Sequence, residues 1–301
     1  MRKRKWLLIV VVIIIMINLL FWGMTYLFDV NSYIKDRLTK TIGRDLNATI
    51  SFSALNLTSK ILQISDLEII HNEGDFILRA KQLYLHFSFW ELLLHKFQFA
   101  QALKEIRCFS PEIIYNASYD KEQTKLNIDI DALEKTLIRF DYISVINGQV
   151  SVNSKGEIVF SENLEKINVS LQKQQDKKWH IKMSAFQSGK EGSIDLDGIY
   201  AKQSNQFKIM FKDYDVPKIN TTNAALTGSR INAEFEATLS EISKGTVRIS
   251  NIESTFHDES ISSKEVAILL TPDSLKIDKN AKILWNNNVI LCDGYIYHRN
   301  F

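Results

Sequence analysis

Apolar and polar residues alternate with a period of two through most of the chain. In the stretch from residue 191 to residue 212, the apolar positions are Ile194, Leu196, Gly198, Tyr200, Phe207, Ile209 and Phe211. A period of two is typical of β-strands that have one apolar and one polar face. The pattern continues to the end of the chain, and no later segment resembles a helical layer or a second sheet. The sequence therefore predicts a long apolar sheet face without an evident protein cover.

Seventeen segments with this pattern begin at residue 48, and they predict roughly sixteen strands, spaced as in an antiparallel meander. They are residues 48–57, 61–70, 75–89, 104–116, 125–130, 142–153, 157–161, 165–172, 178–186, 193–201, 206–212, 230–239, 245–256, 264–270, 274–278, 282–285 and 289–297. Two short helical interruptions are predicted, at 90–96 and 131–140. The predicted fold class is therefore mainly β.

Three dipeptides are typical of two-residue hairpin turns, namely Asn147-Gly148, Asp197-Gly198 and Asp293-Gly294. At the first two, the alternation continues in phase through the glycine. This favours a glycine inside a strand, at a bulge or bend that adds curvature to the sheet. The third dipeptide is predicted to be a hairpin turn.

The N-terminus has the pattern of a membrane anchor. From Leu7 to Phe28 the chain has no charged residue, and about 20 apolar residues suffice for a helix to cross the hydrocarbon core. A cleaved signal peptide has a shorter apolar run and a small-residue cleavage site, and this segment has neither. The basic residues at positions 2 to 5 predict a cytoplasmic N-terminus, with everything after Asp29 on the other side of the membrane.

A short amphipathic helix is predicted next, over residues 29–47. Ile34, Leu38, Ile42 and Leu46 recur every four residues and form one apolar stripe. Two placements are open: the helix packs against the sheet of its own chain, or it lies on the membrane surface.

Charge and histidine content exclude several classes of function. The chain has 37 basic and 35 acidic side chains, so it lacks the clustered basic excess of a nucleic-acid-binding surface. Its six histidines occur singly, without the spacing of metal ligands. We therefore predict no nucleic acid, no metal and no cofactor.

Catalytic motifs are also absent from the sequence, including phosphate-binding loops, nucleophile elbows and zinc-protease motifs. The pairs Asp129/Asp131 and Asp195/Asp197 lie in the polar phase of their strands, which predicts a solvated outer face. Cys108 and Cys292 are predicted to be buried free thiols, and one long-range disulfide is the alternative. The chain is therefore predicted not to be an enzyme.

Residues 33–115 resemble the N-terminal region of the AsmA-like proteins, which include TamB and are related in fold to the chorein-type bridge-like lipid transfer proteins. The matching features are the helix at 33–46, the strands at 48–89, the apolar segment 90–96, the strand at 102–116 with Pro111, the strand at 140–152 with its glycine, and the later sheet at 164–201. These features are hydrophobic patterns and a few glycines, and they include no catalytic residue.

The resemblance implies a single-pass protein of the bacterial inner membrane whose bulk lies in the periplasm. It implies a long twisted antiparallel sheet that is curled into an open apolar groove, which carries phospholipid toward the outer membrane. The expected organisation is a cytoplasmic tip and anchor over 1–28, the amphipathic helix over 29–47 and the groove domain over 48–301. The strand pattern still holds near residue 301, so we expect either a continuation of the sheet or a partner at its far end.

Acyl chains would then cover the apolar face, and the candidate lipid-binding residues are Ile194, Leu196, Phe207, Ile209, Phe211, Phe235 and Leu239. The predicted partners are membrane phospholipids and the inner membrane. Two alternatives are kept. In one, the chain is an assembly scaffold that offers sheet edges to an outer-membrane β-barrel protein. In the other, it is a closed β-sandwich that buries its own apolar face.

The anchor makes a prediction about topology. A reporter that is active only in the periplasm, fused after residue 60, should be active because the basic residues hold the N-terminus inside. An inactive fusion, or a mature N-terminus found beyond Phe28, would contradict it.

Overall fold

The computed structural model describes residues 47–58, 60–88, 91, 94, 102–118, 140–155, 158–174, 178–201, 205–221, 224–238, 242–257, 259–272, 274–286 and 288–297. Several predictions lie wholly or almost wholly outside these residues: the anchor, the helix over 29–47, the strand at 125–130 and both helical interruptions. Within the described ranges, no helix has the length and apolar character needed to span a bilayer.

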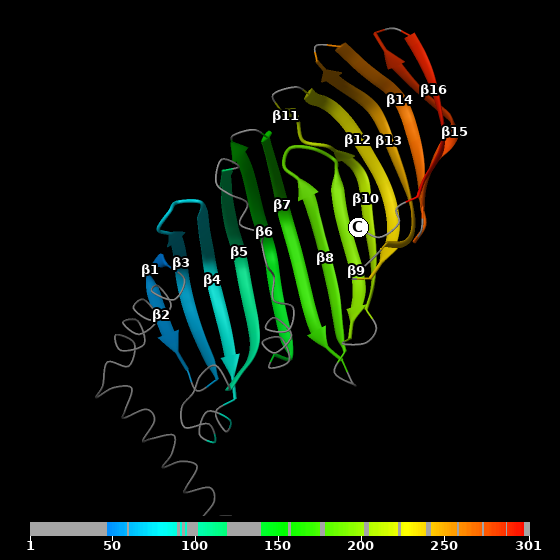
Figure 1. Ribbon diagram of the computed structural model, residues 1–301. Helices are drawn as coiled ribbons and strands as arrows, with labels where there is room; N and C mark the ends of the chain where they lie inside the picture. The colour runs from blue at the N-terminus through cyan, green and yellow to red at the C-terminus, as the bar shows by residue number, and fades with distance from the viewer. Residues whose placement is uncertain are drawn as a thin grey trace, which may run out of the picture.

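One sheet of sixteen strands accounts for the described structure (Figure 1). The strands are β1 (Ala48–Ser51), β2 (Ala54–Leu57), β3 (Ile61–His71), β4 (Phe76–Phe87), β5 (Leu103–Ser118), β6 (Tyr142–Lys155), β7 (Ile158–Lys173), β8 (Trp179–Gln187), β9 (Ser193–Tyr200), β10 (Gln206–Asp215), β11 (Ile219–Thr221), β12 (Ala224–Ala237), β13 (Ile242–Phe256), β14 (Glu259–Leu270), β15 (Ser274–Trp285) and β16 (Asn288–Tyr297). The prediction of a mainly β protein is confirmed.

The strands follow one another across the sheet almost in chain order, and nearly all neighbours are antiparallel. The exception is the pair β5–β6, which is parallel, with Ile106 opposite Ile143 and Ile113 opposite Val150. The prediction of a purely antiparallel sheet is therefore wrong at this pair. Parallel neighbours need a crossover of a dozen or more residues, and the segment between Ser118 and Tyr142 is long enough to make one.

Some predicted strand boundaries differ from those observed. The segments 157–161 and 165–172 belong to one strand, β7, and 274–278 and 282–285 belong to β15. The segment 48–57 forms two strands that both pair with β3, and β11 was not predicted. In β7 the reason is the polar residue Glu162, which lies between the two predicted segments at a position of the apolar phase. A bulge at Lys166, whose φ is +51°, follows within the second segment without ending the strand.

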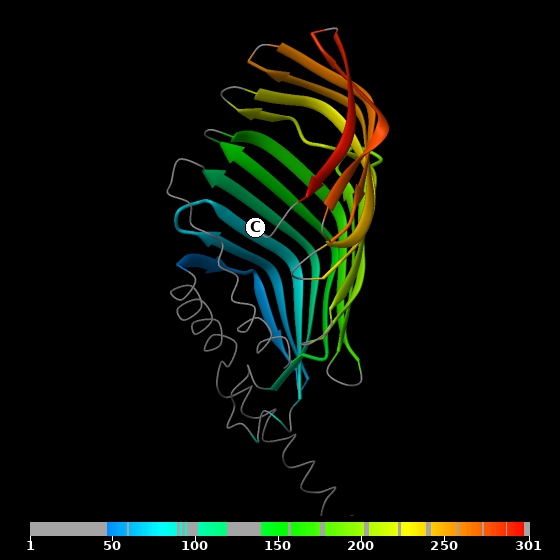
Figure 2. The ribbon, with the colours of Figure 1, turned by 45° about the vertical axis from the view of Figure 1, so that its right-hand side comes forward.

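A line of β-bulges crosses the sheet and bends it. The residues with positive φ along this line are Asp66, Ser110, Asn147, Lys166, Asp213 and Asn251. Neighbouring strands also lose register there, for example between Val145 and Gly148 in β6 and between Phe211 and Tyr214 in β10. Figure 2 shows the strands turning sharply partway along their length.

Each bulge preserves the apolar face across the bend. The apolar phase steps by three residues at these points, for example from Ile64 to Leu67 and from Val145 to Gly148. Because side chains alternate with a period of two, a single extra residue keeps the next apolar side chain on the original face. The in-strand bulge predicted at Asn147-Gly148 is confirmed. In the sequence, the alternation runs in phase through Gly148 because Ile146 is also apolar. In the structure, Ile146 lies on the face opposite to Val145 and Gly148.

The other two dipeptides do not form turns, although the register of β16 with β15 shifts between Gly294 and Cys292. Gly198 lies in the unbroken register of β9, opposite Phe207, so the bulge or bend predicted there is not found. Its missing side chain is replaced by the Phe207 ring, since an added Cβ would lie 2.4 Å from Phe207 Cδ1. Gly294 is inside β16, opposite Ile277, so the hairpin turn predicted at Asp293-Gly294 is wrong.

The two sides of the bend contain different numbers of strands. On one side, β8, β9 and β10 separate β7 from β12. On the other side, only β11 does so, with Asn220 opposite Val159 of β7 and Ile219 opposite Leu226 of β12. A difference of two strands is roughly 10 Å of sheet width, so the sheet must coil at this place, which we call the seam.

Close packing is concentrated at the N-terminal end of the sheet. The buried cluster consists of Phe52, Leu62, Ile64, Leu67, Ala80, Phe87 and Ala102. Apolar side chains from β8 onward are mostly only partly buried, and the exceptions are Trp179, Ala185, Val266 and Ala281. Within the described part of the chain, most of the apolar face therefore lacks the tight protein cover that a domain core has.

The bulge at Asn147 makes a prediction about stability. Asn147→Val should lower the free energy of unfolding by about 1–2 kcal/mol, because a left-handed backbone conformation is costly for a residue with a branched Cβ. Gln149→Val, at an exposed position of the same strand, is the matched control and should be near neutral. Urea unfolding midpoints measure both, and equal midpoints would contradict the strained bulge.

Candidate functional site: the apolar face of the sheet

The structure brings the predicted lipid-binding residues together on one face. Ile209 of β10 lies directly opposite Leu196 of β9 and Phe235 of β12. Phe211 lies opposite Ile194, and its ring stacks on that of Phe235 with centroids 6.2 Å apart. Phe207 precedes Ile209 by two residues in β10 and lies on the same face. Leu239 is outside the described residues. The common face predicted for the other six residues is therefore confirmed.

These residues belong to a much longer feature, which we call the central apolar row. Its members lie opposite one another in successive strand pairs from β2 to β16, and every member is apolar. The members are Leu55, Ile64, Leu83, Cys108, Val145, Val169, Met183, Leu196, Ile209, Phe235, Gly245, Leu270, Leu275 and Ile296. At the usual strand spacing the row is roughly 60 Å long.

A second apolar row runs beside the first, two residues away along each strand except in β13, where a register shift makes the spacing three. It consists of Leu57, Leu62, Leu85, Ile106, Ile143, Leu171, Ile181, Gly198, Phe207, Ala237 and Ile242. Together the two rows form a continuous apolar band. Sequence reasoning identified only the part in β9, β10 and β12. The alternation was visible elsewhere, but the bulges and the parallel pair concealed which residues lie opposite one another.

The opposite face carries polar side chains at the positions between the two rows. These positions are Asn56, Gln63, Tyr84, Arg107, Ser144, Ser170, Lys182, Asp197, Lys208, Glu236 and Lys244. The predicted solvated face for Asp195 and Asp197 is confirmed as the side opposite the apolar row, where Asp197 is exposed. Asp129 and Asp131 lie outside the described residues.

Ion pairs on this polar face are exposed and weak. Lys208 Nζ lies 2.5 Å from Glu234 Oε1, which raises the pKa of Lys208. His180 Nε2 lies 2.6 Å from Asp197 Oδ1, and this hydrogen bond lowers the pKa of Asp197. Exposed pairs of this kind contribute little to stability, because water screens them. The polar face is therefore a solvated surface, and the apolar band is the unusual feature of the sheet.

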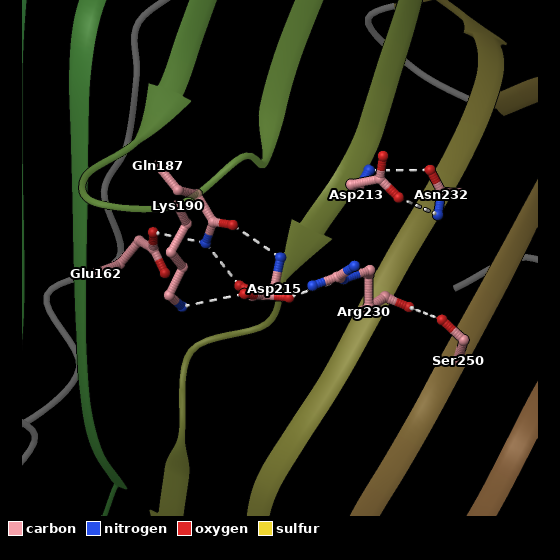
Figure 3. A network of polar contacts seen from close by, with 8 residues as sticks. All are labelled: Glu162, Gln187, Lys190, Asp213, Asp215, Arg230, Asn232 and Ser250. Carbon is pink, nitrogen blue, oxygen red and sulfur yellow. Dashed lines mark hydrogen bonds and ion pairs between the residues drawn. The ribbon is translucent and has the colours of Figure 1, made fainter.

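The apolar side of the sheet is interrupted by a polar cluster at the seam, shown in Figure 3. Gln187, at the end of β8, is only 1% exposed. Its Oε1 accepts a hydrogen bond from the Asp215 backbone N–H at 2.7 Å, and its Nε2 donates to the Asp215 carbonyl at 2.6 Å. The amide therefore pairs with β10 as a strand backbone would. The same Nε2 also donates to Glu162 Oε1 at 3.1 Å.

A separate charged group lies at the seam around the Asp215 carboxylate. The Asp215 carboxylate accepts a hydrogen bond from Arg230 Nε at 3.0 Å and lies 3.7 Å from Lys190 Nζ. Gly192 must be a glycine at this place, because an added Cβ would lie 2.2 Å from Gln187 Oε1. Nothing in the strand pattern pointed to Gln187, since its role depends on where three strands end.

The described residues include potential metal ligands and both cysteines, for which the sequence made predictions. No group of three His, Cys, Asp or Glu side chains among the described residues is placed to hold a metal ion. Cys108 and Cys292 are both free, so the predicted free thiols are confirmed and the alternative of a disulfide is excluded. Both are only partly buried, so the prediction that they are buried is wrong. Burial raises the pKa of Cys108, which disfavours the reactive thiolate.

Gln187 provides a test of the seam. Gln187→Ala should lower the free energy of unfolding by about 1–3 kcal/mol, because it leaves the N–H and C=O groups of Asp215 without these partners. Gln172→Ala, at an exposed position of β7, should have little effect. Chemical denaturation of both variants measures the difference, and an unchanged midpoint for Gln187→Ala would show that the seam does not depend on this amide.

Comparison with known proteins does not assign the chain to a family. No protein-family model matches it, and no curated protein matches it. The functional interpretation therefore depends on the geometry of the sheet and on the sequence pattern.

Proposed function

We propose that the protein is a membrane-anchored carrier of phospholipids, whose acyl chains lie along the apolar band of the sheet. The central apolar row carries this proposal. Fourteen neighbouring strands contribute an apolar residue to it without interruption. A protein surface of this size that is apolar and incompletely covered needs an apolar partner.

Burial at the bend supports a groove on the apolar side. Ala80 and Ala185 on this side are 2% and 0% exposed, whereas Asp66, Lys81 and Lys166 on the other side are exposed. This contrast is expected if the strands bend toward their apolar face, so that the face lines the inside of a groove. The described strands form one sheet, which argues against the alternative of a closed β-sandwich.

The length of the band favours a conduit for several lipids over a pocket for one. The row is roughly 60 Å long, and the acyl chains of one bilayer leaflet span roughly 15 Å. Several lipids would fit side by side across successive strands. In this proposal the N-terminal anchor holds the protein in the inner membrane, and the groove leads lipid through the periplasm toward the outer membrane.

A second candidate function is a scaffold that pairs a sheet edge with another β-protein. The observation in its favour concerns β16, whose only described neighbour is β15. Val289 and Leu291 of β16 are 62% and 69% exposed, and they lie on the face that is polar elsewhere. An edge strand that is apolar on both faces favours pairing with another strand. Crosslinking from Val289 to an outer-membrane β-barrel protein would support this function.

Ile209 and Lys208 give a direct test of lipid carriage. A photo-crosslinking residue at position 209 should capture lipid in cells, and one at position 208 should not, because the two side chains lie on opposite faces. Extraction and mass spectrometry of the crosslinked full-length chain measure this. Equal labelling at both positions, or no lipid at 209 in a folded protein, would contradict the proposal.

Substitution at the same positions gives a second readout. Ile209→Asp should abolish lipid binding, since a charge buried under acyl chains costs a few kcal/mol or more. Lys208→Gln is the matched control, because Lys208→Asp would place a carboxylate beside Glu234, Asp197 and Glu236. If Ile209→Asp merely unfolds the chain, the crosslinking result decides.

A further inference from the structure

The polar cluster at the seam lies on the apolar side of the sheet, where a carboxylate is unexpected. Glu162 of β7 lies opposite Val152, in the same phase as Leu164. Tyr214 of β10 lies opposite Ile231, one bulge beyond Phe211, and its pKa is raised by burial and also by the nearby Glu162 carboxylate. Gln187 completes the group. We call Glu162, Gln187 and Tyr214 the seam cluster.

The seam cluster holds the Glu162 carboxylate in a defined position. Gln187 is fixed by its two hydrogen bonds to the Asp215 backbone and donates to Glu162. Burial and the neighbouring Glu162 carboxylate raise the pKa of Tyr214 to about 12, so Tyr214 adds no negative charge to the cluster at neutral pH. A carboxylate can accept about four hydrogen bonds, and the one from Gln187 leaves capacity for a ligand.

The charge of Glu162 lacks a direct counterion within the described part of the chain. The nearby cations Lys190 and Arg230 pair with Asp215, and no described Lys, Arg or His lies within ion-pair distance of Glu162. Glu162 is itself partly accessible. A half-exposed carboxylate beside an apolar surface attracts a cation more strongly than one in bulk water does.

We infer that the seam cluster binds the cationic ammonium group of a phospholipid whose acyl chains lie on the adjoining apolar band. This inference rests on the proposed lipid-carrier function and adds a headgroup class to it. Glu162 accepts hydrogen bonds from the ammonium group, whereas the carboxylate repels an anionic headgroup that has no amine. Gln187 is a positioning residue that orients the carboxylate.

The distance along β10 fits the size of a phospholipid. Seven residues separate Tyr214 from Phe207, at the far side of the apolar band, which corresponds to roughly 20 Å of strand. Acyl chains of one leaflet span roughly 15 Å. Phe211 lies between the two ends and contacts the Tyr214 ring edge to face, with centroids 5.5 Å apart. A lipid with its ammonium group at Glu162 would therefore place its tails on the predicted binding residues.

The test measures which lipid the full-length protein extracts from vesicles that contain equal amounts of phosphatidylethanolamine and phosphatidylglycerol. Wild-type protein should extract roughly threefold more phosphatidylethanolamine, as expected for one half-exposed ion pair. Glu162→Gln should lose this preference and still bind the same total amount of lipid. Glu236→Gln, which removes a carboxylate from the polar face, should retain the preference.

The outcomes separate the headgroup site from the proposed function. Lipid bound without preference by the wild type, or a preference that persists in Glu162→Gln, would overturn the headgroup site and leave the carrier function intact. No lipid bound by the wild type would overturn both. The wild-type ratio is informative even if Glu162→Gln is unstable, because it requires no variant.

Discussion

The structure depends on the in-register pairing of strands across a sheet whose two faces differ. A slip of one residue between two strands would move every apolar side chain of one strand to the polar face. The central apolar row is therefore a property of the pairings as a set, and no single contact creates it. The registers that join Leu196, Ile209 and Phe235 also place Asp197, Lys208 and Glu236 together on the other side. One constraint thus produces both the apolar band and the charged face.

The bend introduces a problem that the bulges solve. A sharp turn in a strand disturbs its ladder of hydrogen bonds, and a bulge confines the disturbance to one extra residue. Because neighbouring strands have such bulges, for example at Asp66, Asn147 and Asp213, the sheet can turn and keep one face apolar. At the seam, where three strands end together, the Gln187 side chain takes over the pairing that a further strand residue would make.

The functional proposal follows from the contrast between the two ends of the apolar face. Near β3 and β4, the chain packs its own side chains into a buried cluster. From β8 onward, large side chains such as Phe207, Ile209 and Phe235 are only partly buried. An interior that is packed at one end and open along the rest fits a surface that accepts mobile acyl chains, because such chains need contact without tight interlocking. The carboxylate at the seam then marks where a polar headgroup would lie.

The sequence by itself determined the fold class, the two faces and the common face of six candidate residues, because a period of two specifies which side chains share a face. It also indicated the bulge at Asn147-Gly148. The tertiary structure decided which residues of different strands lie opposite one another. Contacts between distant segments produce three features that the pattern did not predict. These are the parallel pairing of β5 with β6, the continuity of β7 through Lys166 and the in-strand position of Gly294. The seam cluster was invisible for the same reason: Glu162, Gln187 and Tyr214 lie on three strands, and only the ending of β8, β9 and β10 at one line brings them together.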